Sequence, residues 1–298
     1  MSEVIKSYKG FNRDLTCRGK QYEVGKEYEE DRAQSCECGM HACEYPLDCF
    51  SYYDPAHSVY YEVEQSGDLS RRGDDSKVAS TKMKIGAEIN IAGMVKASIN
   101  YIRERIKEEK GSDDDYGVSS ATGNYGASSA TGYKGVSSAT GDYGASSATG
   151  HYGASSATGN YGASSATGYK GVSSATGNYG ASSATGNYGA SSATGDYGAS
   201  SATGHCGASS ATGYKGASSA KDPESIAIAW GYKGRVSGVK GSFLVLADWE
   251  GDESEYWKPD SWKLKGAKMV RVDGEHIKEN TWYTMRNGKI VEVTEDDR

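Results

Sequence analysis

Residues that build large globular cores are scarce in this chain of 298 residues, which has only four prolines and three phenylalanines. Hydrophobic residues make up 36% of the sequence, below the roughly 45–50% usual for soluble domains, a figure that counts glycine but not tyrosine. This deficit excludes one conventional core over the whole length. No apolar run approaches the ~18–20 residues that span a bilayer, so neither a transmembrane helix nor a membrane partner is expected.

Other absences narrow the function classes. The first ten residues lack an apolar segment, so we expect no secretory signal and a cytoplasmic location. Six cysteines in a chain without a secretory signal are expected to be free thiols or metal ligands rather than disulfides. The formal net charge is −7 and no segment is strongly basic, so a nucleic-acid partner is not expected. No dinucleotide-binding, Walker or HExxH motif occurs, and we expect no cofactor.

Glycine and tyrosine, in contrast, are abundant, with 40 and 23 residues. Many belong to twelve consecutive nine-residue units from Tyr116 to Pro223, with the pattern [Tyr/Lys]-Gly-[Ala/Val]-Ser-Ser-Ala-Thr-Gly-x. Two degenerate units, 224–232 and 233–241, continue in the same frame. A strict register over so many units is not needed by a flexible linker, and two glycines per unit oppose a helix. The short period therefore predicts a β-solenoid.

The unit suits a five-residue strand closed by a glycine turn. Two arms of nine residues would form one coil, and the fourteen units would form seven coils in a thin rod roughly 30–35 Å long. Alternation places positions three, five and seven on one strand face and positions four and six on the other. In the first degenerate unit the former set is Ile226, Ile228 and Trp230. These large apolar side chains favour an inward orientation of that set.

Position one of the unit predicts a binding surface, because regularly spaced tyrosines there would stack into a ladder beside the turns. The leading hypothesis is a non-enzymatic binding or structural protein that presents a regular Tyr/Ser/Thr surface to a protein partner. Homo-oligomerisation through exposed solenoid faces is a further expectation. The candidate binding residues are the tyrosines at position one: Tyr116, Tyr125, Tyr143, Tyr152, Tyr161, Tyr179, Tyr188 and Tyr197.

Two other uses of the repeats come from the same pattern. A calcium β-roll needs several oxygen ligands per site, but the array holds only Asp142, Asp196 and Asp222 as carboxylates, too few to bind calcium in series. A face of serine and threonine at fixed spacing could instead order water or ice. That function stays open as an alternative.

The flanks have the composition of ordinary protein and predict three parts: an α+β domain over 1–115, the solenoid over 116–241 and a β-rich C-terminal cap over 242–298. A helix is expected from about Ile89 to Lys110, and a short one over Leu47–Tyr53. One apolar stripe marks the longer helix: Ile91, Met94, Val95, Ile99, Ile102 and Ile106. Asn287-Gly288 predicts a type I′ hairpin turn. The predicted strands outside the repeats are Val4–Phe11, Gln21–Tyr28 with a turn at Val24-Gly25-Lys26, Ser58–Gln65, Val78–Ile85, Ser242–Trp249, Ala267–Val272 and Thr281–Met285.

The densest cluster of reactive side chains is Cys36, Cys38, His41 and Cys43, whose thiolates and imidazole are the ligands that zinc prefers. The spacing matches no standard zinc finger or ribbon, so buried thiols and a hydrogen-bonded histidine are the competing interpretation. A nucleophilic cysteine, Cys36 or Cys43 with His41 or His57 as base, is a further alternative.

An enzyme in the N-terminal domain is the remaining alternative. It would be a nucleotide-using transferase with Arg18, His41 and Glu64 as candidate catalytic residues. Glutamates at alternate positions of one strand, such as Glu62 and Glu64, more often form a solvent-exposed strand face than part of a catalytic site.

Segments of both flanks resemble a known family in their order along the chain. They are YKGFNRDLTCRGK from Tyr8, GMHACEYPLD from Gly39, YYEVEQSGD from Tyr60 and GYKGRVSGVKGSFLVLADW from Gly231. This order resembles an uncharacterised family of phage and prophage proteins with a Gly-x-His-x-Cys box domain, Ser-Ala-Thr-Gly repeats and a β-rich cap. The resemblance implies a phage-associated origin in the host cytoplasm. It also implies a host factor, including a defence system to be inhibited, or a virion protein as partner.

The resemblance implies no activity. His41 and Cys43 match the box of the family, whereas Cys36, Cys38 and Cys49 lie outside its pattern. A zinc site that is shared across the family is therefore not expected at these residues.

Overall fold

The computed structural model describes residues 3–55, 57–72, 76–105, 110–252, 255, 258 and 261–294. The chain divides into two compact units, residues 1–98 and 99–297, and the boundary lies within helix α1 (Ile91–Arg105). The side chain of Asn90 caps this helix, since its Oδ1 accepts a hydrogen bond of 2.8 Å from the Gly93 N–H. Among the described residues, no helix is both long and apolar enough to cross a membrane.

The helix is shorter than its sequence pattern predicts. Ile89 belongs to the preceding strand and Lys110 begins strand β8, while the predicted stripe residue Ile106 lies outside the described residues. Its apolar stripe is confirmed over the described turns, where the exposed fractions are all below 10%. The stripe residues are Ile91, Met94, Val95, Ile99 and Ile102.

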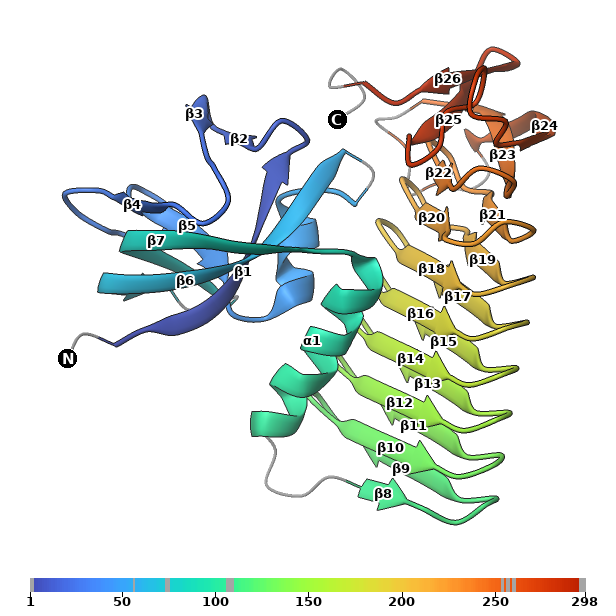
Figure 1. The fold of residues 1–298 in the computed structure, drawn as a ribbon, viewed down its shortest axis with the longest axis horizontal. Coiled ribbons are helices and arrows are strands. Elements are labelled where there is room, and N and C mark those ends of the chain that lie inside the picture. Colours follow the sequence, from blue (N-terminus) through green and yellow to red (C-terminus); the bar gives the residue numbers. More distant parts are fainter. Residues whose placement is uncertain are drawn as a thin grey trace. The chain divides into compact units, whose positions relative to one another are not determined.

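The first unit is a small antiparallel sheet whose strands close on themselves (Figure 1). The strand order is β4-β7-β5-β1-β6, and β7 also pairs with β6, so β1, β6, β7 and β5 form a ring. The strands are β1 (Ile5–Asn12), β4 (Glu27–Glu29), β5 (Met40–Cys43), β6 (Ser58–Arg71) and β7 (Lys77–Ile89). A separate hairpin consists of β2 (Thr16–Cys17) and β3 (Lys20–Gln21).

Local predictions in this unit are corrected in two places. The turn predicted at Val24-Gly25-Lys26 is confirmed, with a Gly25 φ of 83°, but Gln21–Tyr28 is not one strand, because Gln21 ends β3 and β4 begins only at Glu27. The predicted helix Leu47–Tyr53 is a 3₁₀ helix, η1 (Pro46–Ser51), with Pro46 in its first turn. Strands β6 and β7 extend beyond their predicted ends, because they pair with each other along most of their length.

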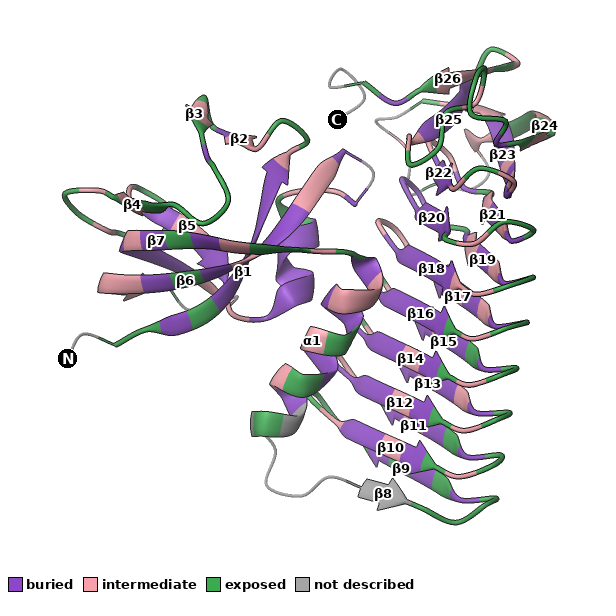
Figure 2. Ribbon diagram, viewed as in Figure 1, coloured by how far each residue is buried: buried purple, intermediate pink, exposed green. Residues whose placement is uncertain are grey.

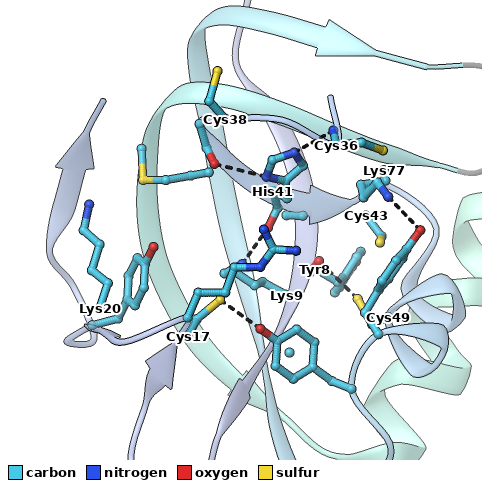
Figure 3. A pocket seen from close by; sticks show the side chains of 18 of the residues that line it. Tyr8, Lys9, Cys17, Lys20, Cys36, Cys38, His41, Cys43, Cys49 and Lys77 are labelled. Atoms are coloured by element: carbon cyan, nitrogen blue, oxygen red, sulfur yellow. Dashed lines mark hydrogen bonds between the residues drawn. The ribbon is translucent and has the colours of Figure 1, made fainter. Parts of the chain in front are cut away.

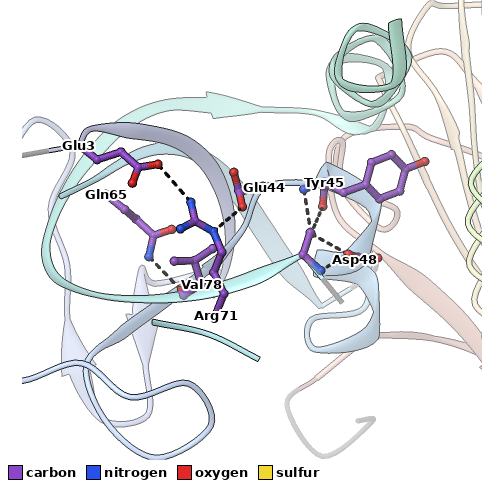
Figure 4. Close-up of polar contacts among 8 residues, drawn as sticks. Glu3, Glu44, Tyr45, Asp48, Gln65, Arg71 and Val78 are labelled. Atoms are coloured by element: carbon purple, nitrogen blue, oxygen red, sulfur yellow. Dashed lines mark hydrogen bonds and ion pairs between the residues drawn. The ribbon is translucent and has the colours of Figure 1, made fainter. Parts of the chain in front are cut away.

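A polar side chain in the interior of the ring, that of Gln65, joins three strands. Figure 4 shows one of its contacts, to Val78. Gln65 on β6 is fully buried, and its Nε2 lies 3.0 Å from the carbonyl oxygens of Met40 and Val78 and from the Ser80 hydroxyl. The buried apolar residues around it form the core of the unit. They are Phe11, Cys17, Tyr22, Met40, Ala42, Tyr61, Val63, Met83 and Ile85.

The second unit contains the predicted β-solenoid, with about seven turns over residues 118–246 (Figure 1). Two parallel sheets are formed by alternate arms, and each strand pairs in register with the strand 18 residues later, as Ala127 does with Ala145. One sheet contains β8 (Lys110–Ser112), β10 (Ala127–Thr131), β12 (Ala145–Thr149), β14 (Ala163–Thr167), β16 (Ala181–Thr185), β18 (Ala199–Thr203), β20 (Ala217–Ala220) and β22 (Arg235–Gly238). The other contains β9 (Val118–Thr122), β11 (Val136–Thr140), β13 (Ala154–Thr158), β15 (Val172–Thr176), β17 (Ala190–Thr194), β19 (Ala208–Ala211), β21 (Ile226–Ala229) and β23 (Phe243–Glu250).

The predicted inward face is wrong. Positions four and six point inward, so that Ser137 and Ala139 are buried while Val136 is 42% exposed. In strands such as β10 and β12 the buried residues precede an exposed last residue (Figure 2). Trp230 in the first degenerate unit is likewise 39% exposed. The reason is the short distance between the sheets: Ser137 of one sheet donates a hydrogen bond of 3.0 Å to the Ser128 hydroxyl of the other. That gap admits serine and alanine but no isoleucine or tryptophan.

The C-terminal strands change the pairing from parallel to antiparallel. Strand β24 (Lys263–Arg271) pairs with β23, and the hairpin of β25 (Tyr283–Arg286) and β26 (Lys289–Glu292) pairs with β22. Asn287 and Gly288 have φ values of 48° and 73°, which confirms the predicted hairpin turn. The buried core here includes Val236, Leu244, Leu246, Val272, Tyr283 and Met285.

Candidate functional site

Five of the eight candidate tyrosines form a stacked ladder along one turn edge of the solenoid. Neighbouring ring centroids lie 4.9–5.1 Å apart, with interplanar angles of 6–8°. The coil length explains the spacing, since position one of every second unit returns to the same edge after 18 residues. We call this row the tyrosine edge: Tyr125, Tyr143, Tyr161, Tyr179 and Tyr197.

The backbone of the tyrosine edge is left-handed, with φ between 56° and 61° at all five residues. A side chain other than glycine in this region costs roughly 1–2 kcal/mol per residue. Stacked aromatic pairs contribute about 0.5–1.5 kcal/mol each beyond their burial. The four stacked pairs therefore offset part of the cost of placing a tyrosine where glycine or asparagine would be easier.

A second ladder supports the same turns. The Oδ1 of Asn160 accepts a hydrogen bond of 3.0 Å from the backbone N–H of Asn178, one coil later. Equivalent bonds run along the row, with donor–acceptor distances of 2.8–3.2 Å. The acceptors are Asn124, Asp142, Asn160, Asn178 and Asp196. These side chains keep the edge rigid and place two carboxylates beside the tyrosines.

The other three candidates, Tyr116, Tyr152 and Tyr188, lie on the opposite arms and do not stack on one another. Lys134 and Lys170 occupy position one between them, with Nζ atoms 5.3–5.9 Å from the tyrosine ring centroids. The predicted ladder is therefore confirmed on the tyrosine edge and wrong here, because lysines separate the rings. We call this row the mixed edge.

The first unit contains a cavity of about 440 Å³ that collects residues from distant parts of the sequence (Figure 3). Arg18 and His41 both line it, whereas Glu64 is exposed on β6 and does not. Five of the six cysteines line the cavity as well: Cys17, Cys36, Cys38, Cys43 and Cys49. The proposed catalytic trio is thus not assembled, because Glu64 points away from the other two residues.

His41, on strand β5, is held by the backbone of the loop that precedes this strand. Its Nε2 accepts a hydrogen bond of 3.0 Å from the Cys36 N–H, and its Nδ1 lies 3.1 Å from the Gly39 carbonyl oxygen. Since a carbonyl can only accept, Nδ1 carries the proton and the ring is neutral. Burial, followed by the nearby Lys9 ammonium, lowers the pKa of His41. Both ring nitrogens are thus engaged, and neither has a free lone pair for a metal or for a thiol proton.

The thiols differ from one another in their surroundings. Cys36 is exposed and adopts a φ of 69°, and a hydrogen bond from Lys77 lowers its pKa. Cys17 and Cys49 are buried, with Sγ atoms 2.8 Å from the Tyr53 hydroxyl and 3.1 Å from the Tyr8 carbonyl oxygen. Across the described parts of the chain, no three cysteine, histidine or carboxylate side chains gather closely enough to hold a metal ion. The four zinc candidates therefore share a cavity without forming a ligand set.

Two lysines of this cavity were missed by the sequence reasoning. Lys9 is buried and its Nζ donates a hydrogen bond of 2.7 Å to the His41 carbonyl oxygen, while Lys77 donates one of 2.9 Å to the Tyr52 hydroxyl. The sequence feature that could have indicated Lys9 is the Lys9-Gly10-Phe11 segment, near the start of the first segment that resembles the family. A Cβ at Gly10 would lie 2.5 Å from the Tyr53 side chain, so this glycine lets the cavity wall pack closely.

Comparison with known families covers the first unit only. Residues 5–97 match a family model described as "Domain of unknown function (DUF7666)". No curated protein and no solved structure matches the chain.

Proposed function

We propose that this chain is a non-enzymatic binding protein whose solenoid presents the tyrosine edge to a protein partner. The observation that supports this most directly is the left-handed backbone at five stacked tyrosines. A solenoid turn needs no aromatic ring there, and glycine would be less strained. Rigid aromatic side chains lose little conformational entropy on binding, and tyrosine is enriched in protein interfaces.

The geometry of the ladder favours a protein over other ligands. Sugars and bases bind to the faces of aromatic rings, but each inner ring has both faces covered by its neighbours at about 5 Å. The neighbouring row contains Asp142 and Asp196, which repel a phosphate backbone. Ring edges and a flat row of polar turns remain, and these suit a neutral or basic protein surface.

The resemblance to phage and prophage proteins supports a phage-associated origin of this chain, and with it a partner that such a protein would meet. We propose that the partner is either a host factor, such as a component of a defence system that the protein inhibits, or a virion protein. Binding would take place in the host cytoplasm. In either case the binding is stoichiometric, and the partner is held without chemical change.

The test is a reconstitution with matched variants. Tyr143→Asn, Tyr161→Asn and Tyr179→Asn together remove the centre of the ladder and suit the left-handed backbone. Tyr152→Asn with Lys170→Asn alters the mixed edge as a control. A partner identified in bacterial lysate and then purified should bind the wild type and the control at a fixed ratio, and the ladder variant at least about tenfold more weakly. Equal binding by all three proteins would refute the proposal.

A second candidate function rests on the outer face of the nine-stranded sheet. The threonines at position seven are exposed there, and the serines at position five lie mostly half-exposed, in columns that the parallel register keeps aligned. Such a face could order water or ice. The purified protein should then show thermal hysteresis, and Thr140→Leu with Thr158→Leu should abolish it. Absence of hysteresis in the wild type would exclude this function.

A further inference from the structure

The two ends of the solenoid differ in how their edge strands are protected. At the C-terminal end, β24 is the last strand of the nine-stranded sheet, and its pairing with β23 contains a register shift (Figure 1). Charged side chains, lysine above all, and bulges keep a sheet edge from pairing with another chain. This end therefore resists edge-to-edge association. The cations of β24 are Lys263, Lys265, Lys268 and Arg271.

The opposite edge of the same sheet lacks these devices. Within the described residues β9 is the last strand there, and it pairs with β11 in register over all five of its residues. Its sequence, Val-Ser-Ser-Ala-Thr, contains neither a charge nor a proline. Val118 is 72% exposed, and Tyr116, just before the strand, is 70% exposed. A straight edge strand of this kind is a template for pairing with another chain.

The backbone groups on the open side of β9 follow from its pairing on the other side. The Val136 N–H donates a hydrogen bond of 2.9 Å to the Gly117 carbonyl oxygen, and the Gly123 N–H donates one of 2.8 Å to the Thr140 carbonyl oxygen. Successive residues of a strand direct these groups to alternate sides. The N–H and C=O groups on the open side are therefore those of Val118, Ser120 and Thr122.

The narrow interior of the solenoid restricts what can continue this end. Directly behind β9, the Ser128 hydroxyl donates a hydrogen bond of 2.9 Å to the Ser119 hydroxyl of the opposite sheet. Sheets with ordinary apolar side chains between them lie about 10 Å apart. A partner that extends both sheets must have an interior of equally small residues. A second copy of this chain has that interior.

We propose that two copies of this chain associate through their β9 edges, with the two strands antiparallel and Ser120 opposite its own equivalent. In this register Val118 lies opposite Thr122, so the outward groups of all three residues form hydrogen-bonded pairs. A two-fold axis relates the copies, and such an interface is closed. The protected C-terminal ends cannot extend it, so the assembly stops at a dimer.

The charges and the edges of the solenoid are compatible with this arrangement. Asp113, Asp114 and Asp115 precede β9 and are exposed. Antiparallel pairing places the two acidic clusters at opposite ends of the paired strands, so they do not face each other. Tyr125 follows β9, so the tyrosine edges of the two copies lie on opposite sides of the dimer. The dimer itself does not depend on the function proposed for the tyrosine edge.

Sedimentation equilibrium of the full chain over roughly 1–500 µM tests the proposal. Because short strands form a small interface, we expect a monomer–dimer equilibrium with a Kd on the order of 10–100 µM and no larger species. Ser120→Pro removes an outward N–H at an edge where proline is tolerated. Ser120→Lys places two ammonium groups opposite each other. Each variant should weaken the dimer at least about tenfold.

The matched control is Ser138→Lys, at the equivalent position of β11, which should dimerise like the wild type. Circular dichroism checks that each variant folds. A wild type that stays monomeric throughout, or that forms larger oligomers, would overturn the proposal. Equally tight dimers of both Ser120 variants would do the same, and so would a monomer that binds a strand of another protein at this edge.

Amide hydrogen exchange of the wild type gives a second readout. As the dimer forms, exchange should slow in the peptide that covers β9 and stay unchanged in the peptide that covers β11. Exchange at β9 that does not vary with concentration would contradict the proposed location. The variant with Tyr143→Asn, Tyr161→Asn and Tyr179→Asn should dimerise like the wild type, so failure of this proposal and failure of the tyrosine edge are distinguishable.

Discussion

The Ser155 hydroxyl donates a hydrogen bond of 2.9 Å to the Ser146 hydroxyl, and the two serines belong to opposite sheets of the solenoid. The same relationship repeats every nine residues from Ser218 to Ser119, at distances of 2.8–3.0 Å. Each inner serine both donates and accepts, so the interior is polar and yet satisfied. A continuous row of hydroxyls takes the place of an apolar core.

Removing one hydroxyl from this row should destabilise the solenoid. In Ser164→Ala, Ser173 loses its acceptor and Ser155 loses a donor. We expect a loss of about 1–3 kcal/mol in the free energy of unfolding, measured by urea denaturation. Ser165→Ala, on the half-exposed outer position of the same strand, is the control and should cost less. Equal losses would show that the hydroxyl row contributes nothing.

A glycine between stacked coils should tolerate no side chain. A Cβ on Gly159 would lie 2.3 Å from the Gly141 carbonyl oxygen, which is backbone and cannot turn aside. Gly123, in the first coil, has a similar positive φ and nothing within 4 Å of its Cβ position. Gly159→Ala should therefore lower the thermal unfolding midpoint much more than Gly123→Ala. Similar midpoints for both variants would contradict the close stacking.

Replacing a ladder tyrosine by asparagine should leave the fold intact. Tyr161→Asn loses two stacked contacts, but asparagine adopts a φ of 56° more easily. The two effects oppose each other, so the net change in unfolding free energy should stay within about 1 kcal/mol. Tyr161→Ala lacks this compensation and should be less stable. The comparison is made by thermal denaturation followed by circular dichroism.

The C-terminal loop should lose stability in acid. Backbone N–H groups, above all that of Ile277, donate to Asp273 and lower its pKa to about 2. A depressed folded-state pKa contributes stability that is fully present above the unfolded value near 4 and is lost as the pH falls through about 2. The stability difference between wild type and Asp273→Asn should be constant above pH 5 and vanish toward pH 2. A difference that is independent of pH would refute this assignment.

Cys36 should be a reactive thiol at neutral pH. Its pKa is lowered, above all by the hydrogen bond from Lys77, so more thiolate is present at neutral pH than at an ordinary cysteine. Alkylation of Cys36 by iodoacetamide, followed by mass spectrometry, should reach half its maximal rate at a lower pH than for a free cysteine. Lys77→Met should remove that difference, and Lys84→Met, farther along the same strand, should not.

The solenoid could be predicted from the sequence because every relevant contact repeats with the sequence itself. A nine-residue unit with two arms per coil places each residue on its own equivalent 18 residues later, as Ala145 lies on Ala127. The stacking of Tyr143 on Tyr161 follows from the same arithmetic. The cavity could not be predicted in this way, because Arg18, His41 and Lys77 come from separate loops and strands.

The sequence by itself determined the period, the register of the coils and the hairpin turn at Asn287-Gly288, since these depend on local backbone preferences and on identical neighbours. Only the tertiary structure decided which face of each strand points inward. The large residues of the degenerate unit suggested one face, but the two sheets lie so close that Ser137 and Ser128 share a hydrogen bond. The gap between the sheets excluded the larger side chains, and packing rather than hydrophobicity set the orientation.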